Sequence, residues 1–373
     1  MHTPARRRLL VAALLIALAG VVVLLRPRHA ATPDELAASL TLRAKLAQLL
    51  VVRFDGPAVS RDVDVMVRRQ EVGAVVLYAK SGNIVDETQL RTLTATLQGA
   101  SALPLVIAID QEGGRVDRLE AVRGARPAAS ELAAGNDPAR RAAAAGEEDA
   151  RDLAHLGIQL NLAPVVDVAQ VENLQLAERT FGTTPEAVTR LAGTYLDALQ
   201  ASGRVVGTLK HFPGLGAVSE DPHREVPRHG APRDRLESFD WQPYRILIGR
   251  GGVAVVMVTH LFVTTIDDVN PASLSRALVT GVLRDQFHFD GVVIADALTM
   301  KGVATDSALG DVALRALLAG ADWLMGPTSS TDVAAIVDRL ERAVGSGELA
   351  ATRVDESLHR VLALKQRVGL LAR

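Results

Sequence analysis

The chain contains no cysteine and few aromatic side chains, and each absence excludes a class of protein. Without cysteine it forms no disulfide, has no thiolate nucleophile and builds no cysteine-ligated zinc site. Phe, Trp and Tyr make up only 3% of the 373 residues, which leaves no obvious platform for stacking nucleic-acid bases. No G-x-G-x-x-G turn follows the first apolar run and no P-loop motif is present, so we do not expect a nucleotide ligand.

The chain also lacks a strong charge of either sign, since its formal net charge is −2. Five arginines lie within the first 32 residues, which contain no acid, so the remainder holds 36 basic and 43 acidic residues, a net charge of −7. A mildly acidic body does not suit nucleic acid as the main partner. Linkers, low-complexity tracts and internal repeats are absent as well, which indicates a single domain over residues 33–373.

Residues Leu9 to Leu25 form an uninterrupted apolar run, with arginines at positions 6–8, 26 and 28 on either side. A helix of this length spans about 25 Å, short for a bilayer and long for a cleavable signal peptide. We expect residues 1–32 to be an uncleaved signal anchor with its N-terminus in the cytoplasm, which puts residues 33–373 in the periplasm or outside the cell. A cleaved signal peptide is the alternative.

After a capped helix that begins near Thr32, eight short apolar runs alternate with segments of helical length and spacing. The runs lie at 49–54, 72–78, 103–110, 157–164, 205–212, 253–260, 291–298 and 321–327, and the clearest helical segments at 138–156, 185–202, 236–249 and 275–287. Continuous apolar strands suit a parallel sheet that is buried on both faces. The alternation predicts an α/β fold, a closed (β/α)8 TIM-type barrel, with an open doubly wound sheet as the alternative.

Polar side chains gather where these runs end, which is where a barrel of this type places its active site. The residues are Asp110, Asn161, Asp167, Lys210, His211, His260 and Asp296. Asp296 lies among apolar neighbours, and a carboxylate is costly to bury unless it is hydrogen-bonded, paired or functional. We interpret Asp296 as a nucleophile; a helix N-cap or a structural ion pair is the alternative.

The loop from Lys210 to His223 reads K-H-F-P-G-L-G-A-V-S-E-D-P-H. Asp221 and His223 are two positions apart, so in extended chain their side chains point the same way and the carboxylate can orient the imidazole. Gly214 and Gly216 give the loop freedom to bring the histidine to a substrate. The loop predicts a proton-transfer group, and an incidental pair on a surface loop is the alternative.

Other polar residues suit a hydroxyl-rich ligand. Asp110 can accept hydrogen bonds from sugar hydroxyls, and Arg118 supplies forked donors, whereas we expect Arg115 to be an internal ion-pair partner. We expect Lys210, His211 and Arg179 to donate to substrate, and His260 to be either a pocket wall or a ligand. A metal site is the weaker hypothesis, because H-x-H and H-E-x-x-H spacings are absent and a lysine would repel the cation. The side chains it would use are Asp110, His211, His223 and His260.

Together these motifs resemble glycoside hydrolase family 3, and within it the single-domain β-N-acetylglucosaminidases. The signature K-H-F-P-G-x-G, four residues and D-[ST]-H is matched by residues 210–223. The other matches are I-D-Q-E-G-G-R-V-D-R (109–118), N-L-A-P-V-V-D-V (161–168), E-R-T-F-G (178–182), P-A-S-L-S (271–275) and A-D-A-L-T-M (295–300). The resemblance extends from about residue 41 to residue 326.

The resemblance implies a barrel that hydrolyses terminal β-linked N-acetylglucosamine in two steps with retention of configuration. By position, Asp296 is the nucleophile, His223 the general acid/base and Asp221 its partner. Asp110, Arg118, Arg179, Lys210 and His211 match the sugar-contacting positions. A histidine in place of the second carboxylate is unusual. Imidazole nevertheless suits the role, since its ordinary pKa is about 6.5 and a carboxylate favours its charged form.

The sequence departs from the family pattern at Pro222, which replaces Ser or Thr, and at Leu215, which is often polar. It has no second domain of the kind that supplies the acid/base of the larger family 3 β-glucosidases. This difference favours a β-N-acetylhexosaminidase over a β-glucosidase. We expect a monomeric exo-acting enzyme without metal or cofactor that acts on a carbohydrate from peptidoglycan, such as GlcNAc–anhydroMurNAc fragments. The alternatives are a phosphorylase, another family 3 β-glycosidase, a metal-dependent hydrolase and an inactive membrane-tethered sugar-binding module.

Overall fold

The computed structural model describes residues 32–171, 176, 178–220, 226–300, 303 and 308–372. Its centre is one sheet of eight parallel strands in the order β4-β3-β2-β1-β10-β9-β7-β5, and each of the eight apolar runs of the sequence contains one of them. The strands are β1 (Leu50–Val52), β2 (Ala74–Leu77), β3 (Val106–Ile109), β4 (Leu160–Asn161), β5 (Thr208–Phe212), β7 (Val255–Val258), β9 (Val292–Ala295) and β10 (Trp323–Met325).

The first and last strands in this order, β4 and β5, also approach each other. Parallel bridges join Leu160 to Val206 and Val165 to Lys210. The backbone N–H of Asn161 donates to Val206 O over 2.9 Å. The sheet therefore curves into a nearly closed barrel, which supports the predicted barrel over an open doubly wound sheet.

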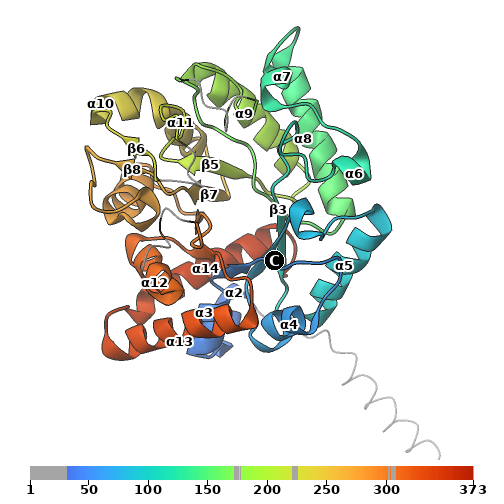
Figure 1. The fold of residues 1–373 in the computed structure, drawn as a ribbon, viewed down its shortest axis with the longest axis vertical. Helices are drawn as coiled ribbons and strands as arrows, with labels where there is room; N and C mark the ends of the chain where they lie inside the picture. Colours follow the sequence, from blue (N-terminus) through green and yellow to red (C-terminus); the bar gives the residue numbers. More distant parts are fainter. Residues whose placement is uncertain are drawn as a thin grey trace, which may run out of the picture.

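Helices surround the strands in chain order, from α4 and α5 through α8 and α9 to α12 and α13 (Figure 1). They are α2 (Pro33–Ser39), α3 (Leu42–Ala47), α4 (Arg61–Asp64), α5 (Glu87–Ala100), α6 (Glu120–Arg123), α7 (Ala129–Ala133), α8 (Pro138–His155), α9 (Pro185–Gln200), α10 (Arg233–Arg235), α11 (Gln242–Gly249), α12 (Leu309–Ala319), α13 (Ser330–Ser346) and α14 (Ala351–Arg367). Short 3₁₀ turns occur at Ala79–Ser81 and Ala272–Leu274.

Local sequence explains where the predicted helices begin. Thr32 caps α2 in a reciprocal capping box with Glu35, as the start signal predicts. Asp137 and Thr184 cap α8 and α9, each followed by a proline whose missing N–H is not needed in the first turn. The predicted helix at 275–287 is instead a π-helical segment, Ala277–Gln286.

Two features lay outside the sequence prediction. A pair of short parallel strands, β6 (Arg228–His229) and β8 (Phe262–Val263), forms a second small sheet. Two further π-helical turns, Val65–Arg69 and Leu236–Asp240, extend α4 and α10. Such single-turn irregularities have no strong sequence signal, because they insert one residue into an otherwise helical pattern.

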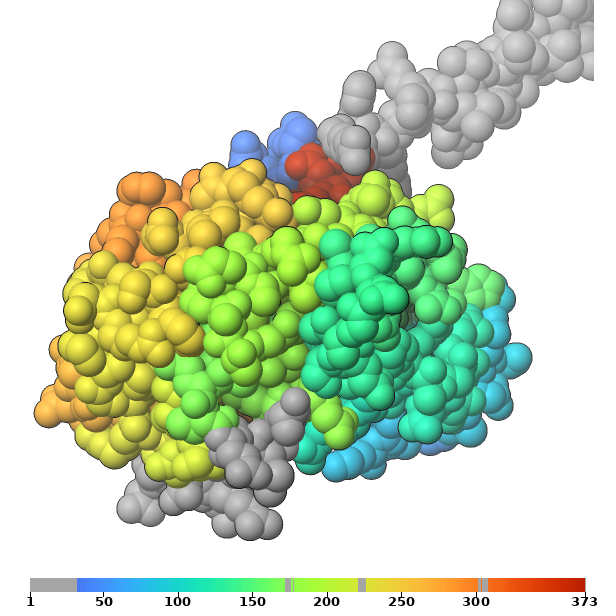
Figure 2. Space-filling model, turned by 90° about the horizontal axis from the view of Figure 1, so that it is seen from above, coloured from blue at the N-terminus to red at the C-terminus, as the bar shows by residue number. Residues whose placement is uncertain are grey.

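Ion pairs around one buried aspartate connect the last helix to the amino end of the barrel. Asp322, which is 0% exposed, precedes β10 and accepts hydrogen bonds from the guanidinium groups of Arg284, Arg353 and Arg360. The last two belong to α14, which also packs against α2. Figure 2 shows the C-terminal segment in red against the N-terminal blue segment. These contacts join both ends of the described chain on one side of the barrel.

None of the helices in the described part of the chain is long and apolar enough to cross a bilayer. The apolar run Leu9–Leu25 lies outside the described residues, so the signal anchor stays a prediction, as does the assignment of residues 33–373 to one domain.

A chain of buried polar groups connects the helical layer to the barrel. The hydroxyl of Tyr195 on α9 donates to Asp149 Oδ2 on α8 over 2.6 Å and accepts from Asn161 Nδ2 on β4 at 3.1 Å. Asn161 also accepts from the backbone N–H of Gln111, two residues after the end of β3. Burial raises the pKa of Asp149 to about 7, although Tyr195 opposes the shift. The Asp149 carboxyl between α8 and α9 is therefore only partly ionised near pH 7.

The raised pKa makes stability depend on pH in a defined direction. Between about pH 4, near the ordinary carboxyl pKa, and pH 7 the folded state holds a proton on Asp149 that the unfolded chain has lost, so stability falls as pH rises. Asp149→Asn keeps the oxygen that accepts from Tyr195 and removes the ionisation. We expect urea unfolding at a series of pH values to give a flatter profile for the variant. Parallel profiles for the two proteins would contradict this assignment.

Candidate active site

A cavity of about 280 Å³ lies at the carboxyl ends of the barrel strands. Its lining is polar, with aliphatic and sulfur-containing side chains on part of the wall. The residues are Tyr78, Lys80, Asp110, Arg115, Val116, Arg118, Leu162, Arg179, Lys210, His211, Leu215, Met257, Thr259, Asp296 and Met325. The cavity contains six of the predicted site residues: Asp110, Arg118, Arg179, Lys210, His211 and Asp296. The structure thus brings together side chains from across the chain.

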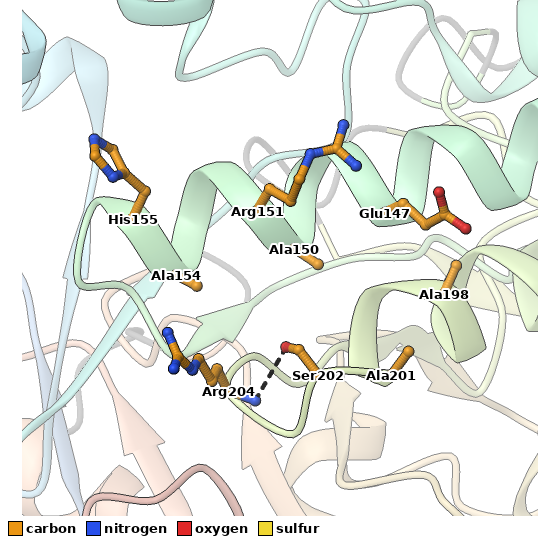
Figure 3. Close-up of a pocket in the computed structure, with 9 residues that line it drawn as sticks. All are labelled: Glu147, Ala150, Arg151, Ala154, His155, Ala198, Ala201, Ser202 and Arg204. Carbon is orange, nitrogen blue, oxygen red and sulfur yellow. Dashed lines mark hydrogen bonds between the residues drawn. The ribbon is translucent and has the colours of Figure 1, made fainter.

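A larger hollow of about 740 Å³ lies between α8 and α9 on the outside of the barrel (Figure 3). Ala150 and Ala154 face it from α8, and the backbone N–H of Arg204 donates to Ser202 Oγ at its edge over 3.3 Å. His155, at the end of α8, forms an ion pair of 2.6 Å with Glu87. Glu87 belongs to α5, which does not line the hollow. The hollow is wide and open, and its lining contains none of the convergent carboxylate and cation pairs of the barrel cavity, so we assign the site to the latter.

Asp296 directly follows β9 and is oriented by its immediate neighbours. Its Oδ1 accepts the backbone N–H of Ala297 over 2.7 Å, and its Oδ2 lies 3.4 Å from the hydroxyl of Thr259, the residue after β7. The backbone N–H of Asp296 donates to Val258 O, which fixes the residue to the neighbouring strand. The carboxylate is half-buried and borders the cavity, so a ligand in the cavity can reach it.

A compact group of opposite charges forms another wall of the cavity. Lys210 Nζ lies 2.5 Å from both Asp110 Oδ1 and Glu112 Oε1. Arg179 makes a bidentate pair with Glu112, at 2.7 and 2.8 Å, and Arg118 lies 3.3 Å from Asp110 Oδ2. The side chains of Lys210 and Glu112 are only 2% and 3% exposed. We call Asp110, Glu112, Arg118, Arg179 and Lys210 the ionic cluster.

The ionic cluster favours the charged forms of Glu112 and Arg179. Burial alone would raise the pKa of Glu112, but Lys210 and Arg179 hold it well below its ordinary value. Burial opposes the charged form of Arg179 as well, yet Glu112 keeps its pKa above the ordinary range. The cavity therefore presents fixed donors and acceptors to a ligand without the reorganisation that free side chains would need.

Tyr78 and Glu112 are site residues that we did not assign from the sequence. Tyr78 follows β2, lies under the guanidinium of Arg118 and borders the cavity. Burial and the carboxylates of Asp110 and Asp296 raise the pKa of Tyr78, so its hydroxyl stays protonated and can donate. Tyr78 could have been assigned to the site from the sequence, because it is a polar aromatic residue at the carboxyl end of a strand. The sequence indicates Glu112 less clearly, because this residue lies in a loop motif between Asp110 and two glycines.

The structure places the remaining residues that we predicted from the sequence in different surroundings. Arg118 forms the ion pair with Asp110, and Arg115 borders the cavity too. His260 is fully buried, with its ring nitrogens 2.7 Å from Ser273 Oγ and 3.0 Å from Ala297 O, so it supports the wall beside Asp296. Asp221 and His223 lie outside the described residues. Their proposed acid/base role therefore stays a prediction.

Within the described ranges, no three His, Asp or Glu side chains are grouped so that they could hold a metal ion. The ring of His211 is 3.2 Å from Arg179 at Nε2 and 2.7 Å from Asp167 at Nδ1. A cation placed there would meet Lys210 and Arg179, so the donor set does not suit a divalent metal.

The chain is similar to proteins of one known family. The family model for the glycosyl hydrolase family 3 N-terminal domain matches residues 41–364. The β-hexosaminidase LpqI of Mycobacterium tuberculosis is 37% identical over 91% of this chain and 86% of its own length. A β-hexosaminidase of Tolumonas auensis is 34% identical over 75% of this chain and 83% of its own.

Solved structures give the same result. A family 3 β-N-acetylglucosaminidase from a Paenibacillus species superimposes with a TM-score of 0.85 and 35% identity, covering 89% of this chain and 63% of that one. The fold and site thus define a barrel enzyme with a half-buried carboxylate, that of Asp296, at the carboxyl ends of its strands. The chain belongs to glycoside hydrolase family 3.

Glu112 balances the charge of two buried cations, so replacing it by the neutral glutamine should destabilise the folded protein. We expect Glu112→Gln to lower the free energy of unfolding by about 3–5 kcal/mol, the usual effect of removing one partner from a buried pair. Glu237→Gln is the matched control, since Glu237 pairs with Arg233 on the surface and should change stability by less than about 1 kcal/mol. Urea unfolding measures both, and equal stabilities would refute a central role for Glu112.

Proposed function

We propose that this chain is a retaining, exo-acting β-N-acetylglucosaminidase. Its membership of family 3 supports the proposal, as do the β-hexosaminidases among its relatives. The observation that carries it is the half-buried carboxylate of Asp296 in the cavity that the ionic cluster lines. That arrangement offers a nucleophile to one atom of a ligand while polar groups hold its hydroxyls.

The size of the cavity supports action at a chain end. Its volume of about 280 Å³ is at the lower limit of small-molecule sites, roughly 300–1,000 Å³, and suits one sugar ring. Asp110 can accept from sugar hydroxyls, and Lys210 and Arg179 can donate to them. The apolar side chains of Met257 and Met325 provide a surface for the less polar faces of the ring or an acetamido methyl.

In the first step the Asp296 carboxylate attacks the anomeric carbon, and the bond to the departing oxygen breaks. A proton passes to that oxygen from His223, whose ring Asp221 orients, which gives a covalent glycosyl-enzyme and a neutral aglycone. Thr259 and the Ala297 N–H hold the attacking carboxylate in place, and the hydroxyl of Tyr78 can donate nearby.

In the second step His223, now neutral, takes a proton from water as the water oxygen attacks the same carbon. The bond to Asp296 breaks and its carboxylate is restored. Two inversions at one carbon leave the sugar in its original β configuration. The imidazole thereby serves both steps without a second carboxylic acid.

We propose muropeptide or chito-oligosaccharide fragments of the cell wall as the natural substrates, with the N-terminal segment holding the enzyme at the membrane, facing the periplasm or the exterior. The apolar run Leu9–Leu25 and its flanking arginines support the location. Cell fractionation with protease protection tests it, and a cytoplasmic soluble enzyme would contradict it.

Asp296→Asn keeps the shape of the side chain and removes the nucleophile. We expect release of p-nitrophenol from p-nitrophenyl β-N-acetylglucosaminide to fall by at least about 10²-fold, because the covalent route is lost. In Asp296→Ala, added azide should restore turnover and give the α-azide. Glu237→Gln is the control and should keep wild-type rates. Full activity in either Asp296 variant would exclude this residue as the nucleophile.

His223→Ala removes the proposed proton donor while leaving Asp296 in place. We expect kcat/KM to fall by about 10²–10⁴-fold for a poor leaving group such as methanol, and less for p-nitrophenol, which needs little protonation. Steady-state kinetics on the two glycosides measure the difference. An equal loss on both would argue against a role as general acid.

Two alternatives have separate signatures. A phosphorylase would release sugar 1-phosphate and slow in phosphate-free buffer, whereas a hydrolase would not. A binding module would bind N-acetylglucosamine, which calorimetry would detect, but it would hydrolyse no β-N-acetylhexosaminide.

A further inference from the structure

Behind the cavity, His211 contacts a buried carboxylate on the neighbouring strand connection. Its Nδ1 lies 2.7 Å from Asp167 Oδ2, and Asp167 is 0% exposed. The other oxygen, Oδ1, accepts the backbone N–H groups of His211, at 3.3 Å, and Leu215, at 2.8 Å. One carboxylate thus holds both the ring and the backbone of the segment that carries Lys210.

The identity of these partners fixes the proton on the His211 ring. A carboxylate held by donors can only accept, so Nδ1 must carry the hydrogen. The guanidinium of Arg179, 3.2 Å from Nε2, can only donate, so Nε2 must present its lone pair. Both neighbours therefore select the same neutral tautomer.

We propose that Asp167 is a positioning residue that holds His211 in the Nδ1–H tautomer, so that Nε2 accepts from Arg179 and helps to hold that guanidinium in the wall of the cavity. From the sequence we expected His211 to donate. Asp167 touches no cavity ligand itself and acts through the imidazole. The kinetic consequence of this inference rests on the proposed function, whereas the proton position does not.

Packing around Asp167 supports a fixed role. The backbone N–H of Val166 donates to Lys210 O over 2.8 Å, and the hydroxyl of Thr180 donates to Asp167 O at 2.6 Å. A Cβ on Gly216 would lie 1.7 Å from Val168 O, so the two segments are in backbone contact. Turning the Asp167 carboxylate away from the ring would also break its hydrogen bonds with the backbone N–H groups of His211 and Leu215.

Nitrogen NMR of protein labelled with ¹⁵N-histidine tests the proton position directly. The ring of His211, assigned by the loss of its signals in His211→Gln, should show a protonated Nδ1 and an unprotonated Nε2 at neutral pH. A proton on Nε2 in the wild-type protein would overturn the proposal. This measurement needs no Asp167 variant to fold and no substrate to be turned over.

Asp167→Asn tests the consequence for catalysis. We expect a folded protein in which kcat/KM for p-nitrophenyl β-N-acetylglucosaminide falls about 10- to 100-fold, as when partners of ligating side chains are removed, and in which the His211 signals change. Asp322→Asn is the matched control, because Asp322 is equally buried but lies before β10, away from the cavity. It should lose stability and keep both kcat/KM and the His211 signals.

Three outcomes would count against the proposal. They are wild-type kinetics in Asp167→Asn, a loss of activity with unchanged His211 signals, and the same loss in Asp322→Asn. Failure of the wild-type protein to cleave any β-N-acetylglucosaminide would refute the proposed function instead and leave the NMR result standing.

Discussion

The buried pairing of Lys210 with Asp110 and Glu112 is the interaction on which the rest of the site depends. Lys210 belongs to β5, the last strand in the sheet order, whereas both carboxylates lie in the loop after β3, the second strand, so the ion pairs connect strands near opposite edges of the opened sheet. An ammonium group this deeply buried is tolerated only when its charge is met at short range. The barrel must therefore stay nearly closed for the cluster to exist, and the cluster in turn holds the polar wall of the cavity.

The wall of the cavity that contains Asp296 is held by hydrogen bonds rather than by buried ion pairs. Asp296 is held by a backbone N–H and by Thr259 beside it, while the fixed charges of the cluster lie elsewhere around the cavity. This division leaves the Asp296 carboxylate half-buried at the cavity, and leaves the donors and acceptors of the cluster fixed by their ion pairs. A family 3 enzyme needs both properties, since positioning and a preorganised field supply much of its rate.

Much of this arrangement could be predicted from the sequence. The eight apolar runs gave the strands, and the rule that sites lie at the strands' carboxyl ends brought Asp110, Lys210 and Asp296 together. The role of Glu112 could not be predicted, because it depends on the side chains of β5 and of the loop near residue 179. The π-helical segment Ala277–Gln286 and the β6–β8 pair have no periodic signal, and Asp221 and His223 lie outside the described residues.

A crystal structure with N-acetylglucosamine would test the central claim most directly. Our account places the sugar in the barrel cavity, with its hydroxyls on Asp110, Lys210 and Arg179 and its anomeric carbon about 3–3.5 Å from an oxygen of Asp296, the separation of a near-attack geometry. The ion pairs of the cluster should be unchanged by binding. A sugar bound between α8 and α9, or one whose anomeric carbon faces away from Asp296, would contradict the account.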